Sequence, residues 1–313
     1  MRWKVLISAP YMQSVIDDFR PFFKENGIEL VVPNVIERLS EKELLAIIDD
    51  IDGVICGDDY FTRKVLEKAK KLKVISKWGT GIDSIDQQAA KELNIAVCNT
   101  PNAFTDPVAD SVLGYILSFA RKIPWSTKDI QAGIWNKIPG VALRESTLGV
   151  IGVGNIGKAV ICRALAFGMT VVGNDICAID KVFTQETGLR IQSREALLAN
   201  SDFVSINCDL NPTSFHLLGE KEFSLMKPCS YLINTARGSI IDETALIKAL
   251  ESKRIAGAAL DVFETEPLSL DNPLKKLGNC LFAPHNANSS PSAWQRVHQN
   301  TINNLLAQLR KSE

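Results

Sequence analysis

Three glycines at a characteristic spacing form the clearest chemical signal in the chain. Gly152, Gly154 and Gly157 make the pattern G-x-G-x-x-G in TLGVIGVGNIGKAV, directly after an apolar strand-like run and at the start of a predicted helix. The first glycine permits a tight turn, the second lets the backbone approach a pyrophosphate, and the third allows close packing of the helix. Asn155 and Ile156 would supply amide groups to that anion at the positive end of the helix.

Asp175 ends the next predicted strand, in VVGND. A carboxylate at this place can accept hydrogen bonds from both ribose hydroxyls of a dinucleotide and repel a 2′-phosphate. The pattern therefore predicts NAD and not NADP as the cofactor. A glycine turn in an unrelated βα protein is disfavoured, because the strand, the helix and the acidic residue are all in place.

Three further residues with complementary chemistry each follow a predicted strand. Arg237 lies in LINTARGSIIDE, Glu266 in LDVFETEP and His285 in LFAPHNA. Ligands of open α/β sheets bind outside the carboxyl ends of the strands, so we expect these side chains to lie in one crevice. A guanidinium can hold a carboxylate, a histidine can move a proton near neutral pH, and a carboxylate beside the histidine can orient its ring and raise its pKa.

The chain contains only three histidines, which shortens the search for a proton carrier. His216 follows NPTSF in a predicted loop, and His298 lies in a predicted C-terminal helix. A solvated or packing role explains both of these better than catalysis. His285 alone follows a strand and a proline in a plausible crevice, and it is the candidate acid/base.

The elements that must position these residues alternate between strand-like and helix-like segments, the pattern of parallel sheets covered by helices. In the first part of the chain, short buried strands are predicted at 3–9, 28–32, 53–56, 73–77 and 95–98. Helices are expected near 12–25, 40–49, 62–70 and 84–93, two of them opened by the capping residues Ser40 and Thr62.

The second part begins with an apolar run, 108–120, which predicts a buried helix. Six strands are then expected at 147–151, 169–173, 203–206, 230–233, 256–260 and 280–282. Six strands with interleaved helices suit a doubly wound nucleotide-binding sheet. Residues 290–309 are predicted to form one last helix.

Composition narrows the class of protein. At about 100–200 residues per domain, 313 residues favour two domains. The 35 Lys and Arg nearly balance 36 Asp and Glu, which argues against a nucleic-acid-binding protein. The seven cysteines are scattered, unlike a disulfide framework or a zinc site, so no metal is expected. Neither a secretory signal nor a membrane span is recognisable, and a cytoplasmic location is expected.

Five motifs in order resemble one known family. GTGIDSID (79–86), GVGNIG (152–157), NTARG (234–238), DVFETEP (261–267) and PH (284–285) look like the D-isomer-specific 2-hydroxyacid dehydrogenases, in particular the phosphoglycerate dehydrogenase-like members. The resemblance implies two doubly wound α/β domains. Residues 1–99, completed by 289–313, would form a flavodoxin-like substrate domain, and 100–288 a Rossmann NAD-binding domain.

The resemblance also assigns roles to residues. It implies that His285 is the acid/base, Glu266 its partner, and Arg237 the anchor for the substrate carboxylate and carbonyl. The backbone amides of Gly79, Thr80 and Gly81 would hold the substrate carboxylate. Beside Arg237 and His285, the residues expected to line the cofactor are Thr235, Ala236, Asp261 and, in a neighbouring loop, Cys208.

The function implied is an NAD-dependent oxidoreductase that moves a hydride between nicotinamide and a small D-2-hydroxy acid or 2-oxo acid. Phosphoglycerate-using relatives commonly carry an arginine where this chain has Cys56, and the nearby Asp58 and Asp59 would repel a phosphate. 3-Phosphoglycerate therefore stays open and is not favoured. The alternative is an NAD(H)-sensing interaction protein resembling the corepressor branch of the family.

A homodimer is also implied by the resemblance, through the predicted helix 105–120 and the segment 121–143. Trp125 and Trp135 in that segment are candidate interface anchors, although each could instead be buried in its own subunit. Trp78, next to the carboxylate-binding loop, could line the substrate or fill the core.

Overall fold

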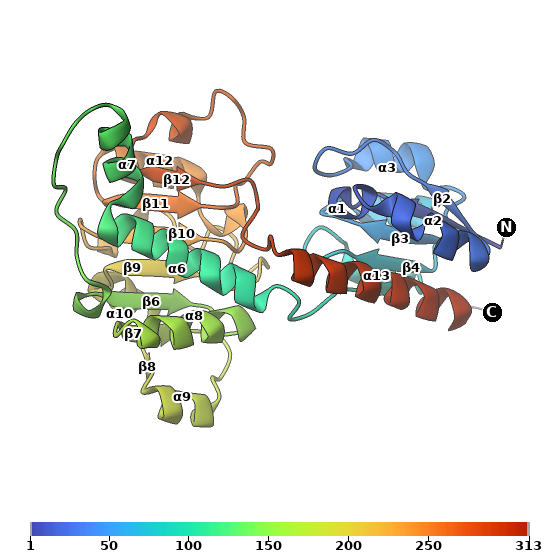
Figure 1. Ribbon diagram of the computed structural model, residues 1–313. Coiled ribbons are helices and arrows are strands. Elements are labelled where there is room, and N and C mark those ends of the chain that lie inside the picture. Colours follow the sequence, from blue (N-terminus) through green and yellow to red (C-terminus); the bar gives the residue numbers. More distant parts are fainter. Residues whose placement is uncertain (1, 312–313) are drawn as a thin grey trace. The chain divides into compact units, whose positions relative to one another are not determined.

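The computed structural model describes residues 2–311 and divides into two compact units (Figure 1). Unit 1 contains the chain up to Phe104 and again from Ser289, and unit 2 is Thr105–Asn288. Residues 100–104 thus belong to unit 1, whereas the sequence assigned them to the nucleotide-binding domain. The reason is local: Thr100 donates its N–H to Gly79 O (2.9 Å), and the Phe104 ring packs against Trp78 (5.6 Å).

Unit 1 is built on a five-stranded sheet in the order β2-β1-β3-β4-β5, with all neighbours parallel. This is the flavodoxin-like order that the family resemblance implied. The strands are β1 (Trp3–Ile7), β2 (Ile28–Val31), β3 (Gly53–Cys56), β4 (Val74–Lys77) and β5 (Ala96–Cys98). The helices are α1 (Pro10–Gln13), α2 (Ile16–Glu25), α3 (Glu41–Ile47), α4 (Arg63–Lys68), α5 (Gln87–Glu92) and α13 (Pro291–Lys311).

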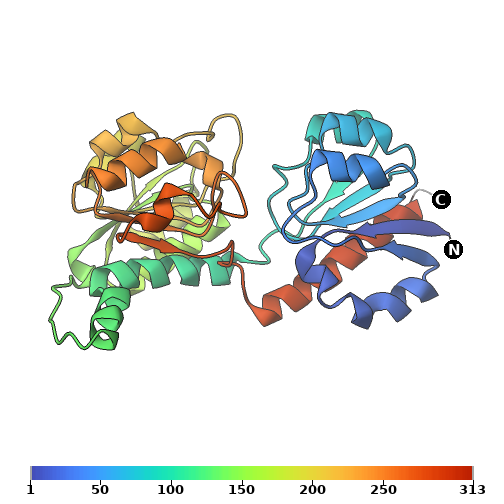
Figure 2. The same ribbon diagram turned by 90° about the horizontal axis from the view of Figure 1, so that it is seen from above.

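Local sequence signals explain where several of these helices begin. The Ser40 side chain accepts the Glu43 N–H at the start of α3, Thr62 does the same for Val65 at α4, and both predicted caps are confirmed. The last helix, α13, lies against the strands of unit 1 (Figure 2). Its Leu305 side chain fits there because Gly53, at the start of β3, has no Cβ.

Unit 2 is built on a seven-stranded parallel sheet in the order β12-β11-β10-β9-β6-β7-β8. Counted from β6, its first six strands have the doubly wound order 3-2-1-4-5-6 of dinucleotide-binding folds. All six predicted strands are present, and the sequence missed β8, which has only two exposed residues and no apolar run. The strands are β6 (Thr147–Ile151), β7 (Thr170–Asn174), β8 (Arg190–Ile191), β9 (Phe203–Ile206), β10 (Tyr231–Asn234), β11 (Gly257–Leu260) and β12 (Cys280–Phe282).

Helices cover both faces of this sheet, as two separate clusters of buried side chains show. The apolar run 108–120 lies in the helix α6, as predicted. Within the part of the chain that the structure describes, no helix combines the length and apolar character needed to cross a membrane. The helices are α6 (Thr105–Arg121), α7 (Ile123–Gln131), α8 (Asn155–Ala166), α9 (Lys181–Thr187), α10 (Arg194–Asn200), α11 (Glu220–Leu225) and α12 (Glu243–Glu251), with short 3-10 turns at Leu143–Glu145, Gly238–Ile240 and Pro273–Lys276.

Candidate active-site residues

The glycine turn after β6 has the shape that a dinucleotide requires. Gly152 has a φ of +89°, and a Cβ on it would lie 2.5 Å from the backbone nitrogen of Cys208, so only glycine fits. A Cβ on Gly157 would collide with the Gly152 carbonyl. A Cβ on Gly154 would meet nothing within 4 Å, so open space faces this residue, where the helix α8 begins. The turn therefore fits a pyrophosphate approaching the backbone at the amino end of α8.

Asp175 is held at this turn by two backbone groups. Its Oδ2 accepts the Val153 N–H (2.6 Å), and its Oδ1 accepts the Cys177 N–H (2.8 Å). Each carboxylate oxygen retains lone pairs that can accept a ribose hydroxyl. The following residues, Ile176–Asp180, include no lysine or arginine that could bind a 2′-phosphate. These features fit NAD.

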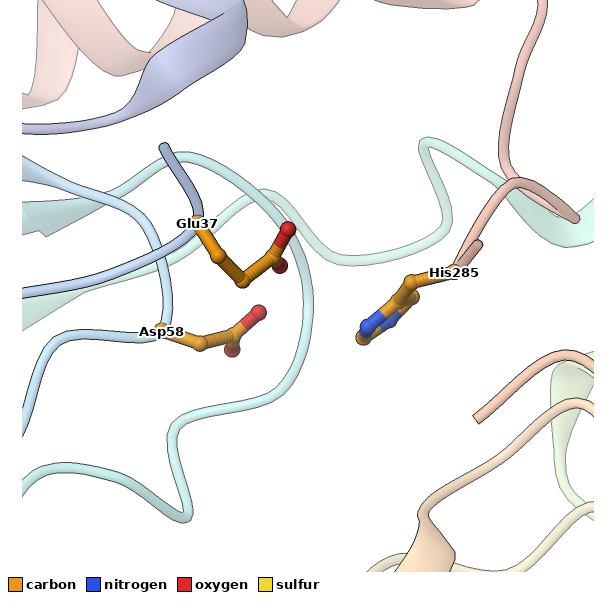
Figure 3. Close-up of side chains that lie close together, drawn as sticks. All are labelled: Glu37, Asp58 and His285. Carbon is orange, nitrogen blue, oxygen red and sulfur yellow. The ribbon is translucent and has the colours of Figure 1, made fainter. Parts of the chain in front are cut away.

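His285 and Glu266 form a pair on the loops that follow β12 and β11 (Figure 3 draws His285). The His285 Nδ1 lies 3.1 Å from Glu266 Oε2, and Glu266 Oε1 accepts the Phe263 N–H at 2.9 Å. The two side chains are 19% and 10% exposed. An ionised carboxylate can only accept, so Nδ1 carries the hydrogen and Nε2 is the atom that can exchange a proton with a substrate.

The turn that carries His285 is anchored on Asp261. His285 has a φ of +51° and donates its N–H to the Asp261 carbonyl (2.7 Å). The buried Asp261 carboxylate accepts the N–H groups of Asn286 (2.8 Å) and Ala287 (2.9 Å). Burial raises the pKa of Asp261 above its ordinary value, against the opposing effect of these two hydrogen bonds. The side chain expected to line the nicotinamide thus also holds the loop that carries His285.

Arg237 lies in a rigid turn after β10. The buried Asn234 accepts the Ala236 N–H on Oδ1 (3.0 Å) and donates to the Arg237 carbonyl (2.8 Å). A Cβ on Gly238 would collide with the backbone of Phe263, so the segment that carries Arg237 contacts the loop that carries Glu266. Since β9, β10, β11 and β12 are parallel neighbours, the residues that follow them share one edge of the sheet. Unit 2 therefore brings Thr235, Ala236, Arg237, Asp261, Glu266 and His285 to one edge, together with Cys208.

The sequence missed a second histidine–carboxylate pair beside the first. His216 Nε2 lies 2.8 Å from Glu264 Oε1, which also accepts the Glu243 N–H at the start of α12 (3.1 Å). The pair connects the loop after β9 with the loop of Glu266. His216 is thus more than a solvated or packing residue. Its partner stands two positions before Glu266 in the same motif, but no local pattern joins residues so far apart in sequence.

Residues 79–81 of unit 1 form the loop that the sequence predicts to hold a carboxylate on its backbone N–H groups. Three successive carbonyls accept side-chain hydrogen bonds: Trp78 O from Lys77 Nζ (3.3 Å), Gly79 O from Thr100 Oγ1 (3.0 Å) and Thr80 O from Asn99 Nδ2 (2.6 Å). The N–H of a trans peptide points away from its carbonyl, so the N–H groups of Gly79, Thr80 and Gly81 each point away from the side chain that binds the carbonyl of the same peptide. None of the three donates to an acceptor in residues 2–311. We call this loop the carboxylate cradle.

The acidic residues near this cradle differ in part from those expected. Asp59 lies in the core, where its carboxylate accepts Ser8 Oγ (2.6 Å) and the Leu39 N–H (2.5 Å), and burial raises its pKa. Neither Asp59 nor the fully buried Cys56 can therefore touch a ligand. Asp58 is paired with the buried Lys77 ammonium at 3.1 Å. Glu37, which the sequence did not single out, lies beside Asp58 within 4.8 Å between carboxylate oxygens (Figure 3).

Comparison with known proteins settles the family. Residues 113–287 match the model described as "D-isomer specific 2-hydroxyacid dehydrogenase, NAD binding domain". The chain belongs to the D-isomer-specific 2-hydroxyacid dehydrogenase family. The resemblance given by the five motifs is confirmed, and unit 2 contains the NAD-binding domain of this family.

The chain covers different shares of the length of its relatives. A glyoxylate reductase of Thermofilum pendens is 39% identical over 278 residues, 87% of this chain and 82% of the relative. A D-3-phosphoglycerate dehydrogenase of Methanocaldococcus jannaschii is 41% identical over 294 residues, 93% of this chain but 54% of the relative. The chain thus spans about half the length of that dehydrogenase. The crystal structure of a D-lactate dehydrogenase from Aquifex aeolicus, complexed with NAD and lactic acid, superimposes with a TM-score of 0.87, at 26% identity and 98% and 96% coverage.

Proposed function

We propose that the protein is an NAD-dependent oxidoreductase that interconverts a small D-2-hydroxy acid and its 2-oxo acid. The observation that carries the proposal is the His285–Glu266 pair, at 3.1 Å, on the sheet that also carries the glycine turn. The family supports it, since its relatives are named as enzymes of this chemistry. Unit 1 is proposed as the substrate domain and unit 2 as the cofactor domain.

Each of the site residues has a task in this reaction. The glycine turn and Asp175 would hold NAD, which would supply the hydride acceptor for oxidation and, as NADH, the hydride donor for reduction. His285 Nε2 gives a proton to the carbonyl oxygen of the 2-oxo acid in reduction and takes it from the hydroxyl in oxidation. Glu266 fixes the tautomer and ring orientation of His285. Arg237 holds the substrate carboxylate and carbonyl oxygen, and the cradle of unit 1 receives the carboxylate on its N–H groups.

Unphosphorylated acids are favoured as substrates over 3-phosphoglycerate. Glu37 and Asp58 lie side by side in unit 1, and two neighbouring carboxylates disfavour a phosphate. The ammonium of Lys77 is already paired with Asp58. The relatives named glyoxylate reductase match over most of their length, which agrees with a small unphosphorylated acid.

A homodimer through the segment 121–143 is proposed from its exposed apolar side chains, which are Ile123, Ile130, Ile134, Trp135 and Val141. Trp135 is 90% exposed, whereas Trp125 donates its indole N–H to Gly278 O (3.0 Å) inside its own unit. Trp135 is therefore the candidate anchor of the two. Sedimentation of wild type and Trp135→Ser at several concentrations tests this. A cytoplasmic location is proposed from the seven free thiols.

The experiment that tests the activity is NADH oxidation, with NADPH as a control, over a panel of 2-oxo acids. The panel contains glyoxylate, hydroxypyruvate, pyruvate, 3-phosphohydroxypyruvate and a bulky 2-oxo acid. Turnover of the unphosphorylated acids with NADH is expected. Tight NADH binding without turnover of any acid would contradict the proposal and favour the NAD(H)-sensing alternative.

A further inference from the structure

The helix α13 contacts the residues on either side of the carboxylate cradle, although it lies far away in the sequence. Three polar contacts make this connection: Ser76 Oγ to Thr301 O (2.8 Å), Trp78 Nε1 to His298 Nδ1 (2.9 Å) and Asn304 Nδ2 to Asn99 O (3.1 Å). Trp78 directly precedes the cradle, and Asn99 holds the Thr80 carbonyl. The helix can therefore influence the geometry of the cradle through the residues that flank it.

The hydrogen bond between Trp78 and His298 joins two buried side chains. Trp78 is 3% exposed and His298 6%. An indole N–H can only donate, so His298 Nδ1 accepts and its hydrogen lies on Nε2. Burial lowers the pKa of His298, which keeps the ring neutral and able to accept.

The ring of Trp78 also packs against other aromatic side chains. It stacks on Tyr11 with a centroid distance of 5.0 Å and meets Trp294 of α13 edge-on at 6.0 Å. The backbone N–H of Trp78 donates to Cys56 O (2.8 Å) in the neighbouring strand β3. These contacts restrict the ring, and in residues 2–311 its indole N–H donates to His298. Trp78 is accordingly part of the core of unit 1.

The orientation of Trp78 matters because its carbonyl and the first N–H of the cradle belong to one peptide. Rotation of the indole about its own side-chain bonds leaves this peptide in place, but a shift of the Trp78 backbone that changes its ψ turns the Gly79 N–H with it. Gly79 itself has a φ of +131° and no Cβ, so it imposes little preference of its own on the loop. The direction of the cradle's N–H groups must therefore come from the residues that flank it.

We propose that His298 is a positioning residue of the carboxylate cradle, acting through the indole of Trp78. This rests on the proposed function in one respect, that the cradle binds the carboxylate of a 2-oxo acid. Loss of the acceptor on His298 leaves the buried indole N–H without a partner. Because the stacked ring has no room to turn, the residue relieves this cost by a shift of its backbone, which takes the Gly79 peptide out of line.

The test compares His298→Phe, which keeps a flat ring and removes the acceptor, with His298→Gln, which retains an acceptor oxygen. In the Phe variant the KM of the 2-oxo acid should rise about 5- to 30-fold, the equivalent of one lost hydrogen bond. The kcat and the Kd of NADH should change less than about twofold, because neither depends on the cradle. The Gln variant should recover most of the lost affinity.

Leu309→Ala is the matched control for general destabilisation of the same helix. Leu309 is fully buried beside Gly53 at the start of β3, the edge of the sheet opposite to the cradle. This variant should lower the free energy of unfolding without raising the KM of the 2-oxo acid. Hydrogen exchange of the Trp78 indole N–H, followed by NMR, should be slow in wild type and Leu309→Ala and fast in His298→Phe.

Titration with oxamate, an unreactive analogue of a 2-oxo acid, separates this proposal from the proposed function. Weaker oxamate binding by His298→Phe than by wild type supports it even if no acid in the panel is turned over. An unchanged KM and oxamate affinity in His298→Phe would overturn it. An equal loss in Leu309→Ala, or no recovery in His298→Gln, would also overturn it, since the role would then be structural.

Discussion

Replacing Glu266 with glutamine should reverse the tautomer of His285. Glu266 uses both of its oxygens, Oε1 for the Phe263 N–H (2.9 Å) and Oε2 for His285 Nδ1 (3.1 Å). The backbone N–H can only donate, so the glutamine must place its carbonyl oxygen there and its NH₂ group against Nδ1. Two donors cannot face each other, and His285 is expected to move its hydrogen to Nε2.

The size of the effect follows from the burial of the pair. A hydrogen bond to a charged group contributes about 1.5–3 kcal/mol, and screening is small because the side chains are only 19% and 10% exposed. At about 1.4 kcal/mol per factor of ten, kcat/KM should fall about 10- to 150-fold. The loss should be nearly equal in oxidation and in reduction, because the equilibrium constant of the reaction fixes the ratio of the two kcat/KM values while the affinities for NAD and NADH are unchanged.

The assay is NADH absorbance in both directions at saturating cofactor over a range of pH. In reduction, the alkaline fall in activity should move to lower pH, since a neutral amide no longer stabilises the protonated ring. Glu264→Gln is the matched control. In the wild type, one oxygen of Glu264, Oε1, accepts both the His216 hydrogen bond and the Glu243 N–H. The amide oxygen of a glutamine can keep both bonds. An unchanged pH profile, or an equal loss in Glu264→Gln, would refute the reasoning.

Further outcomes concern single residues of unit 2. His285→Ala should lower turnover by about 10²-fold or more and leave NADH affinity nearly unchanged by fluorescence titration; normal turnover would remove His285 from the mechanism. Asp175→Ala should reduce the preference for NAD over NADP in kcat/KM, and an unchanged ratio would show that another residue reads the ribose. Gly152→Ala should lower the free energy of unfolding in denaturant titrations, because Gly152 has a φ of +89° and the added Cβ would lie 2.5 Å from Cys208 N. Gly154→Ala should unfold like wild type but bind NADH more weakly, and the opposite pattern would contradict the roles given to the two glycines.

Local spacing accounts for what the sequence could predict. Apolar runs and caps such as Ser40 and Thr62 located the helices and strands within a few residues. Residues that directly follow strands, such as Arg237 and His285, were predictable site candidates because parallel strands end at one edge. Their order along the chain was enough to place them.

Contacts between distant segments account for what the sequence could not predict. The sequence predicted that Asp59, like Asp58, would repel a phosphate, but Asp59 is bound in the core by Ser8 and Leu39, which lie 51 and 20 residues away. The second role of Asp261, as an anchor for the loop 25 residues later, has the same origin. Such pairs leave no periodicity or local motif in the sequence, because the two residues come together only in the folded chain.

The discontinuity of unit 1 has a consequence for the order of events during synthesis. Ser76 of β4 and its partner Thr301 in α13 are separated by 225 residues. The strands of unit 1 therefore leave the ribosome long before the helix that packs against them, and all of unit 2 is made in between. Until α13 arrives, the face around Gly53 is uncovered and vulnerable to aggregation, so slow folding of unit 2 should prolong the exposure of unit 1.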